Sequence, residues 1–285
     1  MKVYNFIAKR SFSSFKKSFT KSIIRLSVIA TSLSLAVMIV AQSIFNGFQT
    51  EIAKKVFGFW GHIRISDIKA SQSQEPIMLI VNDSIRNSIK TSCVDIDGKP
   101  MIQHVQSFLL YPSIMSQSEF NEGLFLKGVG KDFHWEFFNN FLVEGKTLEL
   151  NSSEPSRDVM ISKETAERLE TKIGQSIILH FFVDNEVLKR KVRISGIYNT
   201  GLGEYDKKFA FVDIQLLQTL LGLEAHQVSG LEVICNDVLE AEIVNKNFLK
   251  KFCLTPGIQK QFGSSFHKYL NGYPYKTSLK LLYSY

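Results

Sequence analysis

Residues 26–48 read LSVIATSLSLAVMIVAQSIFNGF, a run of 23 residues without a charged side chain. A helix of this length would span about 34 Å at a rise of about 1.5 Å per residue, and the hydrocarbon core of a bilayer is roughly 30 Å thick. The apolar part of a cleaved signal peptide usually has only about 7–15 residues. A buried helix of a soluble protein is rarely apolar all round. The stretch therefore predicts a transmembrane helix, which we place at residues 22–50.

Positive charge is concentrated before this helix. Residues 1–50 contain seven basic side chains and no acidic one, so 34 − 7 = 27 basic residues face 27 acidic ones in the rest of the chain. A nucleic-acid-binding face would instead spread its basic residues over a folded domain, so we expect no nucleic acid as partner. The positive-inside rule places the N-terminus in the cytoplasm and the chain from Glu51 onward outside it.

Residues 1–21 alternate aromatic and apolar side chains with Lys and Ser. This pattern is typical of an amphipathic helix that lies in the cytoplasmic interface, with its rings among the lipid headgroups and its lysines near anionic lipid. A disordered basic leader is the alternative. The rings and apolar residues are Tyr4, Phe6, Ile7, Phe12, Phe15 and Phe19.

Residues 51–255 have the composition of a folded domain. The membrane helix is expected to continue through Phe57 and to end at Gly58 and Gly61. Short apolar runs bounded by turn residues then predict strands, two of which flank a hairpin signal at Asp184-Asn185-Glu186. Ser162 and Asp213 are expected to cap helices. The irregular order of strands and helices predicts an α+β fold with mostly antiparallel strands. The strands are expected at residues 62–68, 78–81, 108–115, 124–129, 159–161, 176–183, 188–198, 209–214 and 231–235, and the helices at 84–91, 162–171, 213–221 and 237–251.

Catalytic and metal-binding motifs are not found. The chain lacks GxSxG, HExxH, P-loop and GxGxxG patterns, so we predict a non-enzymatic protein without cofactor, metal or catalytic residues. Gly196, Gly201 and Gly203 are interpreted as a loop, because no helix start is expected after them to bind phosphate. The histidines and cysteines are scattered singly at His62, His104, His134, His180, His226 and His267 and at Cys93, Cys235 and Cys253.

Several segments, in this order and spacing, resemble the permease subunits of type VII ABC transporters, above all the lipoprotein-releasing (LolC/LolE) type. The resemblance covers roughly residues 1–255 and implies a MacB-like periplasmic core domain after the first membrane helix. None of the segments is specific by itself. They are the leader at 6–10 before the apolar helix, Gly61-His62-Ile63, Val143-Glu144-Gly145-Lys146, Asp158–Ser162 followed by Ala166, Leu169, Ile173 and Gly174, and residues 192–196 followed by Thr200-Gly201, Glu204, Asp206 and 211–213.

The resemblance also implies a function and partners. A separate cytoplasmic ATPase (LolD-like) would supply the energy, a second permease chain would complete the transporter, and a lipoprotein would be the substrate released from the inner membrane. Macrolide-export and cell-division (FtsX-like) permeases share this fold and stay open as alternatives. A single-pass anchored module that binds a periplasmic partner is a further alternative from a different class.

The last part of the chain departs from the family pattern. From residue 243 to the end there is no acidic residue, and five of the nine tyrosines lie in the last 17 residues. The three further membrane helices of the family are not found. We therefore interpret residues 256–285 as an atypical basic, Tyr-rich tail and expect a gene that was truncated or read out of frame after about residue 255.

Overall fold

The computed structural model describes residues 19–66, 78–91, 98–150, 154–183 and 186–236, together with the single positions 3, 4, 6, 7, 10 and 244. The chain divides into two compact units, Met1–Lys54 and Lys55–Tyr285. Of the predicted leader only positions 3, 4, 6, 7, 10 and 19–21 are described, and the last three belong to the first long helix. The predicted helix at 237–251, except position 244, and the whole tail at 256–285 lie outside the described residues.

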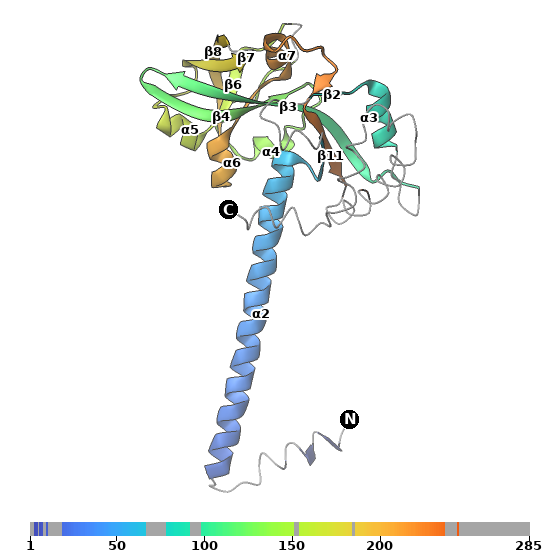
Figure 1. The fold of residues 1–285 in the computed structure, drawn as a ribbon. Coiled ribbons are helices and arrows are strands. Elements are labelled where there is room, and N and C mark those ends of the chain that lie inside the picture. Colours follow the sequence, from blue (N-terminus) through green and yellow to red (C-terminus); the bar gives the residue numbers. More distant parts are fainter. Residues whose placement is uncertain are drawn as a thin grey trace. The chain divides into compact units, whose positions relative to one another are not determined.

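The structure has an unbroken helix, α2, over the predicted span, and it runs from Phe19 to Trp60 (Figure 1). Its most apolar 18-residue window has a mean hydropathy of 2.2 and no buried residue, so the helix is long and apolar enough to cross a membrane. Hydroxyl groups within it donate to carbonyls one turn earlier, as from Thr31 to Ser27 at 2.8 Å.

The helix ends at Trp60, directly before Gly61, as expected for that glycine, but it passes Gly58 without a break. Gly61 has a φ of +72°, and its N–H donates to the carbonyl of Phe57 at 2.7 Å. This left-handed residue directly after the last helical residue is a common way to end a helix, and it favours glycine. The N–H of His62 then donates to the carbonyl of Val233 at 2.9 Å, so the chain passes from the helix into a sheet within two residues.

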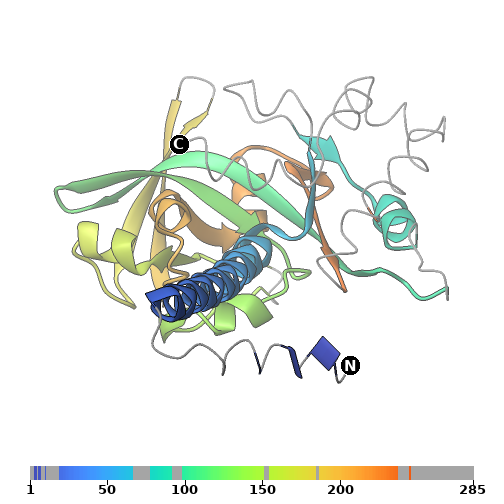
Figure 2. The same ribbon diagram turned by 90° about the horizontal axis from the view of Figure 1, so that it is seen from below.

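The second unit is built on a closed ring of six strands, seen from a second direction in Figure 2. In ring order they are β3 (Ile102–Gln117), β4 (Phe120–Val129), β9 (Phe209–Asp213), β6 (Asp158–Ser162), β8 (Glu186–Tyr198) and β7 (Ser176–Val183), which pairs back to β3. Two strands, β11 (Gly230–Cys235) and then β1 (Ile63–Ser66), extend the sheet from β3, and β5 (Leu142–Gly145) extends it from β8. The short strands β2 (Leu79–Ile80) and β10 (Gln227–Val228) form a separate pair.

The α+β fold with mostly antiparallel strands is confirmed. Among the described strand pairs only β4–β9 and β6–β8 are parallel. The helices are α3 (Asp83–Lys90), α4 (Glu136–Asn139), α5 (Lys163–Arg168), α6 (Gly203–Lys208) and α7 (Ile214–Leu220). Ser162 and Asp213 cap α5 and α7 as predicted, because their side chains accept from the N–H groups of Thr165 and Gln215. The sequence analysis did not predict α4, α6, β5 and β10.

Several strands are buried on both faces. In β9, Ala210 and Val212 belong to a first core that fills the barrel and extends under α3 and α7. Phe211, between them, belongs to a second core on the outside of the barrel. In β6, Val159 likewise belongs to the first core and Met160 to the second. The second core contains Phe59 of α2, so the end of the membrane helix covers one outer face of the barrel.

Candidate functional site

The last turn of α2 is an aromatic segment embedded in the second core. Phe59 is fully buried, and its ring lies 5.4–5.7 Å from the ring centroids of Phe138, Tyr205, Phe209 and Phe211. A Cβ on Gly58 would lie less than 3.0 Å from three carbons of the Phe137 ring. The glycine is therefore needed for the close contact between α2 and α4.

A buried lysine binds the carbonyl end of this helix. Lys127 of β4 has no exposed surface, and its Nζ donates to the carbonyl of Phe59 at 2.6 Å. Carbonyls at a helix C-terminus carry partial negative charge and are left without intrahelical partners, so a cation stabilises them. The ammonium group also lies 4.6–6.0 Å from five ring centroids, those of Phe59, Trp60, Phe108, Phe133 and Phe211.

The counter-ion of Lys127 is Glu232 of β11, which is equally buried. Its Oε1 lies 2.6 Å from Lys127 Nζ, and its Oε2 accepts from Gln106 Nε2 at 2.8 Å. Gln106 is directly opposite Glu232 in the β3–β11 register, and its own Oε1 accepts from the N–H of His134 at 2.9 Å. Oε2 is thus hydrogen-bonded, whereas Oε1 has the ion pair with Lys127 but no hydrogen bond within the described residues.

Burial and charge act on this lysine in opposite directions. Burial lowers the pKa of Lys127, because a charged ammonium loses its hydration. The negative charge of Glu232 raises it again but does not fully compensate. A second cation, the exposed Arg64 of β1, lies opposite Glu232 in the β1–β11 register, and its guanidinium lies 4.7 Å and 4.6 Å from the rings of Trp60 and Phe108.

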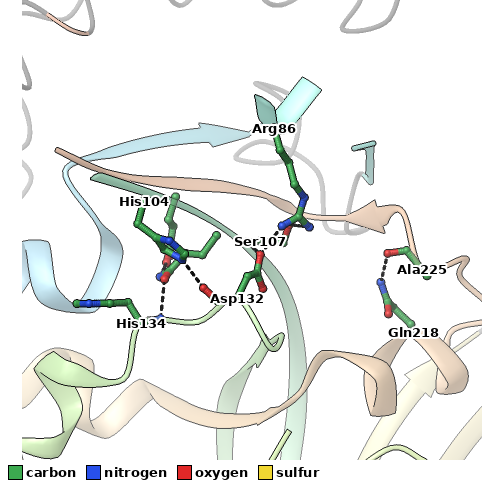
Figure 3. Close-up of polar contacts among 9 residues, drawn as sticks. Arg86, His104, Ser107, Asp132, His134, Gln218 and Ala225 are labelled. Atoms are coloured by element: carbon green, nitrogen blue, oxygen red, sulfur yellow. Dashed lines mark hydrogen bonds and ion pairs between the residues drawn. The ribbon is translucent and has the colours of Figure 1, made fainter. Parts of the chain in front are cut away.

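A second polar cluster, shown in Figure 3, lies on β3, on either side of Gln106, and on the loop after β4. The carboxylate of Asp132 forms an ion pair with Arg86 of α3 and accepts from the N–H of Ser107 at 3.0 Å. Arg86 also donates to Ser107 Oγ at 2.6 Å. The carbonyl of Asp132 contacts His104 Nε2. Hydrogen bonds and an ion pair thus connect the loop at residues 130–135 to β3 and α3. Gln106 also connects this loop to Glu232.

These arrangements hold parts of the fold together. Within the described ranges, no group of three or more His, Cys, Asp or Glu side chains is arranged to hold a metal ion. Two of the described histidines, His104 and His134, lie close together, with ring centroids 6.0 Å apart. His62 Nδ1 accepts from the N–H of Cys235 at 2.9 Å. Cys235 is buried, and Cys93, Cys253 and His267 lie outside the described residues.

The interpretation of Gly201 and Gly203 needs correction. A short helix, α6, does start at Gly203, whereas the sequence analysis expected none. Its first turn carries Glu204 and Asp206, and Asp206 Oδ2 accepts from the N–H of Gly201 at 3.0 Å. The N–H of Gly201 is therefore already bound by a carboxylate.

The sequence analysis did not single out Lys127, Glu232, Gln106 or Asp132. A signal for the first two is present, because each is a lone charge inside an apolar run that was predicted as a strand, residues 124–129 and 231–235. Charged residues are almost never fully buried unless they are paired. A lone Lys in one apolar strand and a lone Glu in another are thus candidates for one buried pair.

The amino-acid sequence of this chain is similar to that of a known transporter protein. The chain is 22% identical over 238 residues to the "Lipoprotein-releasing system transmembrane protein LolE" of Haemophilus influenzae, which is 81% of this chain and 54% of that protein. The chain thus spans about half the length of this relative.

Two solved structures are similar. The extracellular domain of the noncanonic ABC-type transporter YknZ from Gram-positive bacteria has 15% identity and a TM-score of 0.44, covering 66% of this chain and 91% of that one. The periplasmic region of MacB from Actinobacillus actinomycetemcomitans has 11% identity and a TM-score of 0.43, covering 66% and 82%.

The family model described as the MacB-like periplasmic core domain matches residues 26–248. The match includes the apolar part of α2, every strand of the barrel and both Lys127 and Glu232. It covers well over half of the chain, which therefore belongs to the family of the MacB-like periplasmic core domain.

Proposed function

We propose that this chain acts as a permease subunit of an ABC transporter and that the transporter releases lipoproteins from the inner membrane. The family match carries the proposal, because it runs from the apolar helix through the whole barrel at residues 26–248. The cargo is inferred from the relative named as a lipoprotein-releasing transmembrane protein, at 22% identity. The chain would be a non-catalytic subunit, and a separate cytoplasmic ATPase would hydrolyse the ATP.

The proposed topology places residues 22–50 in the membrane, the N-terminus in the cytoplasm and the domain at 51–255 in the periplasm. The basic residues before the span and Arg25 at its cytoplasmic edge support this orientation, since they would stay on the cytoplasmic side. Alkaline phosphatase, which is active only in the periplasm, can be fused after residue 236. We expect an active fusion there and an inactive one after residue 10, and the reverse result would contradict the topology.

In this proposal the barrel is the part that acts on cargo, and α2 connects it to the membrane. α2 runs unbroken from Phe19 to Trp60, so no loop separates residues 22–50 from the helix end at the barrel. The other partners are a second permease chain, which would complete the transporter, and the surrounding lipid.

The test is depletion of the gene that encodes this chain, with three measurements on the same cells. We expect lipoproteins to accumulate in the inner-membrane fraction, while macrolide susceptibility and cell separation stay unchanged. A gain in macrolide susceptibility alone would indicate an exporter, and chains of unseparated cells alone would indicate a cell-division permease. Failure to co-purify any ABC ATPase with the affinity-tagged chain would contradict transport and favour an anchored binding module.

A further inference from the structure

We propose that Lys127 and Glu232, here called the anchor pair, are positioning residues that fix the end of α2 on the barrel. Their role in this proposal is to make the helix end and the strands β3, β4 and β11 move together. The importance of such movement for transport rests on the proposed function, whereas the anchoring itself does not.

The first argument is the direction of the contacts. The second core holds Phe59 by ring contacts, which would still allow the helix end to rotate or slide by a small amount. The hydrogen bond from Lys127 Nζ to the Phe59 carbonyl is directional. Its length of 2.6 Å, together with the ion pair of the same length to Glu232, fixes this carbonyl relative to β4 and β11.

The second argument is energetic. A buried ion pair is a poor way to stabilise a fold, because removing two charges from water offsets most of their attraction. Well-packed apolar residues of similar volume are often neutral or better by about 1–4 kcal/mol. The best-attested use of such a buried polar group is to specify one register or arrangement. At the end of a helix, this means one axial position and one rotation.

The third argument is that the contacts continue beyond the pair. Glu232 binds Gln106, which binds the N–H of His134 in the loop after β4. The carboxylate of Asp132 in the same loop binds Arg86 of α3 (Figure 3). A displacement of the helix end would therefore be passed through neighbouring hydrogen bonds to the loop at residues 130–135 and to α3.

Trp60 is a reporter at the site, because its ring lies 4.6 Å from Lys127 Nζ and Trp135 is the only other tryptophan. The experiment uses the full chain in detergent micelles with Trp135→Phe as background, and compares it with the double variant Lys127→Met/Glu232→Leu. We expect an unchanged thermal unfolding temperature. We also expect the acrylamide quenching constant of Trp60 to rise by about twofold or more, because the helix end opens locally.

The control is Arg193→Met/Asp158→Leu, which removes a partly exposed ion pair between β8 and β6 that does not contact α2. It should leave Trp60 quenching as in the background protein. Equal quenching in the anchor-pair variant and the background would overturn the proposal, since the pair would then only fill space.

A measurement on the unaltered chain covers the case in which the double variant does not fold. The N–H groups of Gly61 and His62 are hydrogen-bonded at the helix end. In native-state hydrogen exchange we expect them to exchange as slowly as amides of β3 and β4. Exchange faster by about a hundredfold or more through local opening would contradict anchoring. Neither readout involves transport, so a negative lipoprotein result with a positive Trp60 result would reject only the proposed function.

Discussion

The contact between α2 and α4 makes a quantitative prediction for Gly58→Ala. The new methyl group would lie less than 3.0 Å from three carbons of the Phe137 ring, whereas carbon atoms in ordinary contact are about 3.5–4.0 Å apart. Overpacking of this kind costs about 1–3 kcal/mol, and Ala in place of a helical Gly returns about 0.5–1 kcal/mol. We expect a net loss of about 1–2 kcal/mol, which for a chain of this size lowers the unfolding temperature by about 3–6 °C.

The matched control is Gly47→Ala in the same helix, where an added Cβ has nothing within 4 Å. This variant should be unchanged or slightly more stable. Differential scanning calorimetry in one detergent gives both unfolding temperatures. In a Phe137→Ala background the three clashing ring carbons are missing, so Gly58→Ala should cost less there. The unaltered chain, Gly58→Ala, Phe137→Ala and the double variant form a double-mutant cycle. An unfolding temperature for Gly58→Ala at or above that of the unaltered chain would refute the close contact.

Three further predictions concern the barrel and its helices. Lys127→Met alone should lower the free energy of unfolding, measured with urea, by about 3–5 kcal/mol, since it leaves the Glu232 carboxylate buried without its cation. The double variant Lys127→Met/Glu232→Leu should recover most of this loss. Ser162→Ala removes the cap of α5, the Ser162 hydroxyl that accepts from Thr165 N–H at 3.1 Å. It should lower the free energy of unfolding by about 1 kcal/mol. Burial raises the pKa of Asp206, against hydrogen bonds from Thr200 and Gly201 that lower it. The protonated Asp206 carboxyl therefore stabilises the fold fully below the pKa of the unfolded chain, about 3.9. This stabilisation is lost as the pH rises through the higher pKa of the folded protein. In Asp206→Asn the free energy of unfolding should fall less steeply with pH over this range. If it falls as steeply as in the unaltered chain, another group causes the pH dependence.

The helix and most strands were predictable because burial leaves a pattern along the sequence. An uncharged run marks α2, and apolar runs between turn residues mark the strands of the barrel. The closure of the barrel was not predictable, because β7 pairs with both β3 and β8, and the pairing with β3 joins residues far apart in sequence. The short helices α4 and α6 have four and six residues, too few turns to give a 3.6-residue period.

The candidate site shows a different limit. The lone charges of Lys127 and Glu232 are visible in the sequence, but their pairing depends on strand order. They lie on β4 and β11, which are separated by β3, so they meet only through side chains that project from the same outer face. Even the correct strand register would not reveal the third partner, since the Phe59 carbonyl belongs to the backbone and has no residue type that marks it.

The position of the pair also limits how this domain can move. To withdraw α2 from the barrel, Phe59 would have to leave the second core, at a cost of about 1.5–3 kcal/mol for its apolar surface. Lys127 and Glu232 would also lose the carbonyl and the rings that compensate for their burial. Because β4, β9 and β6 contribute residues to both cores, such a withdrawal would expose the outer faces of strands whose inner faces fill the barrel. The helix end and the barrel are therefore expected to move as one body, and a movement that separates them would have to unfold part of the second core first.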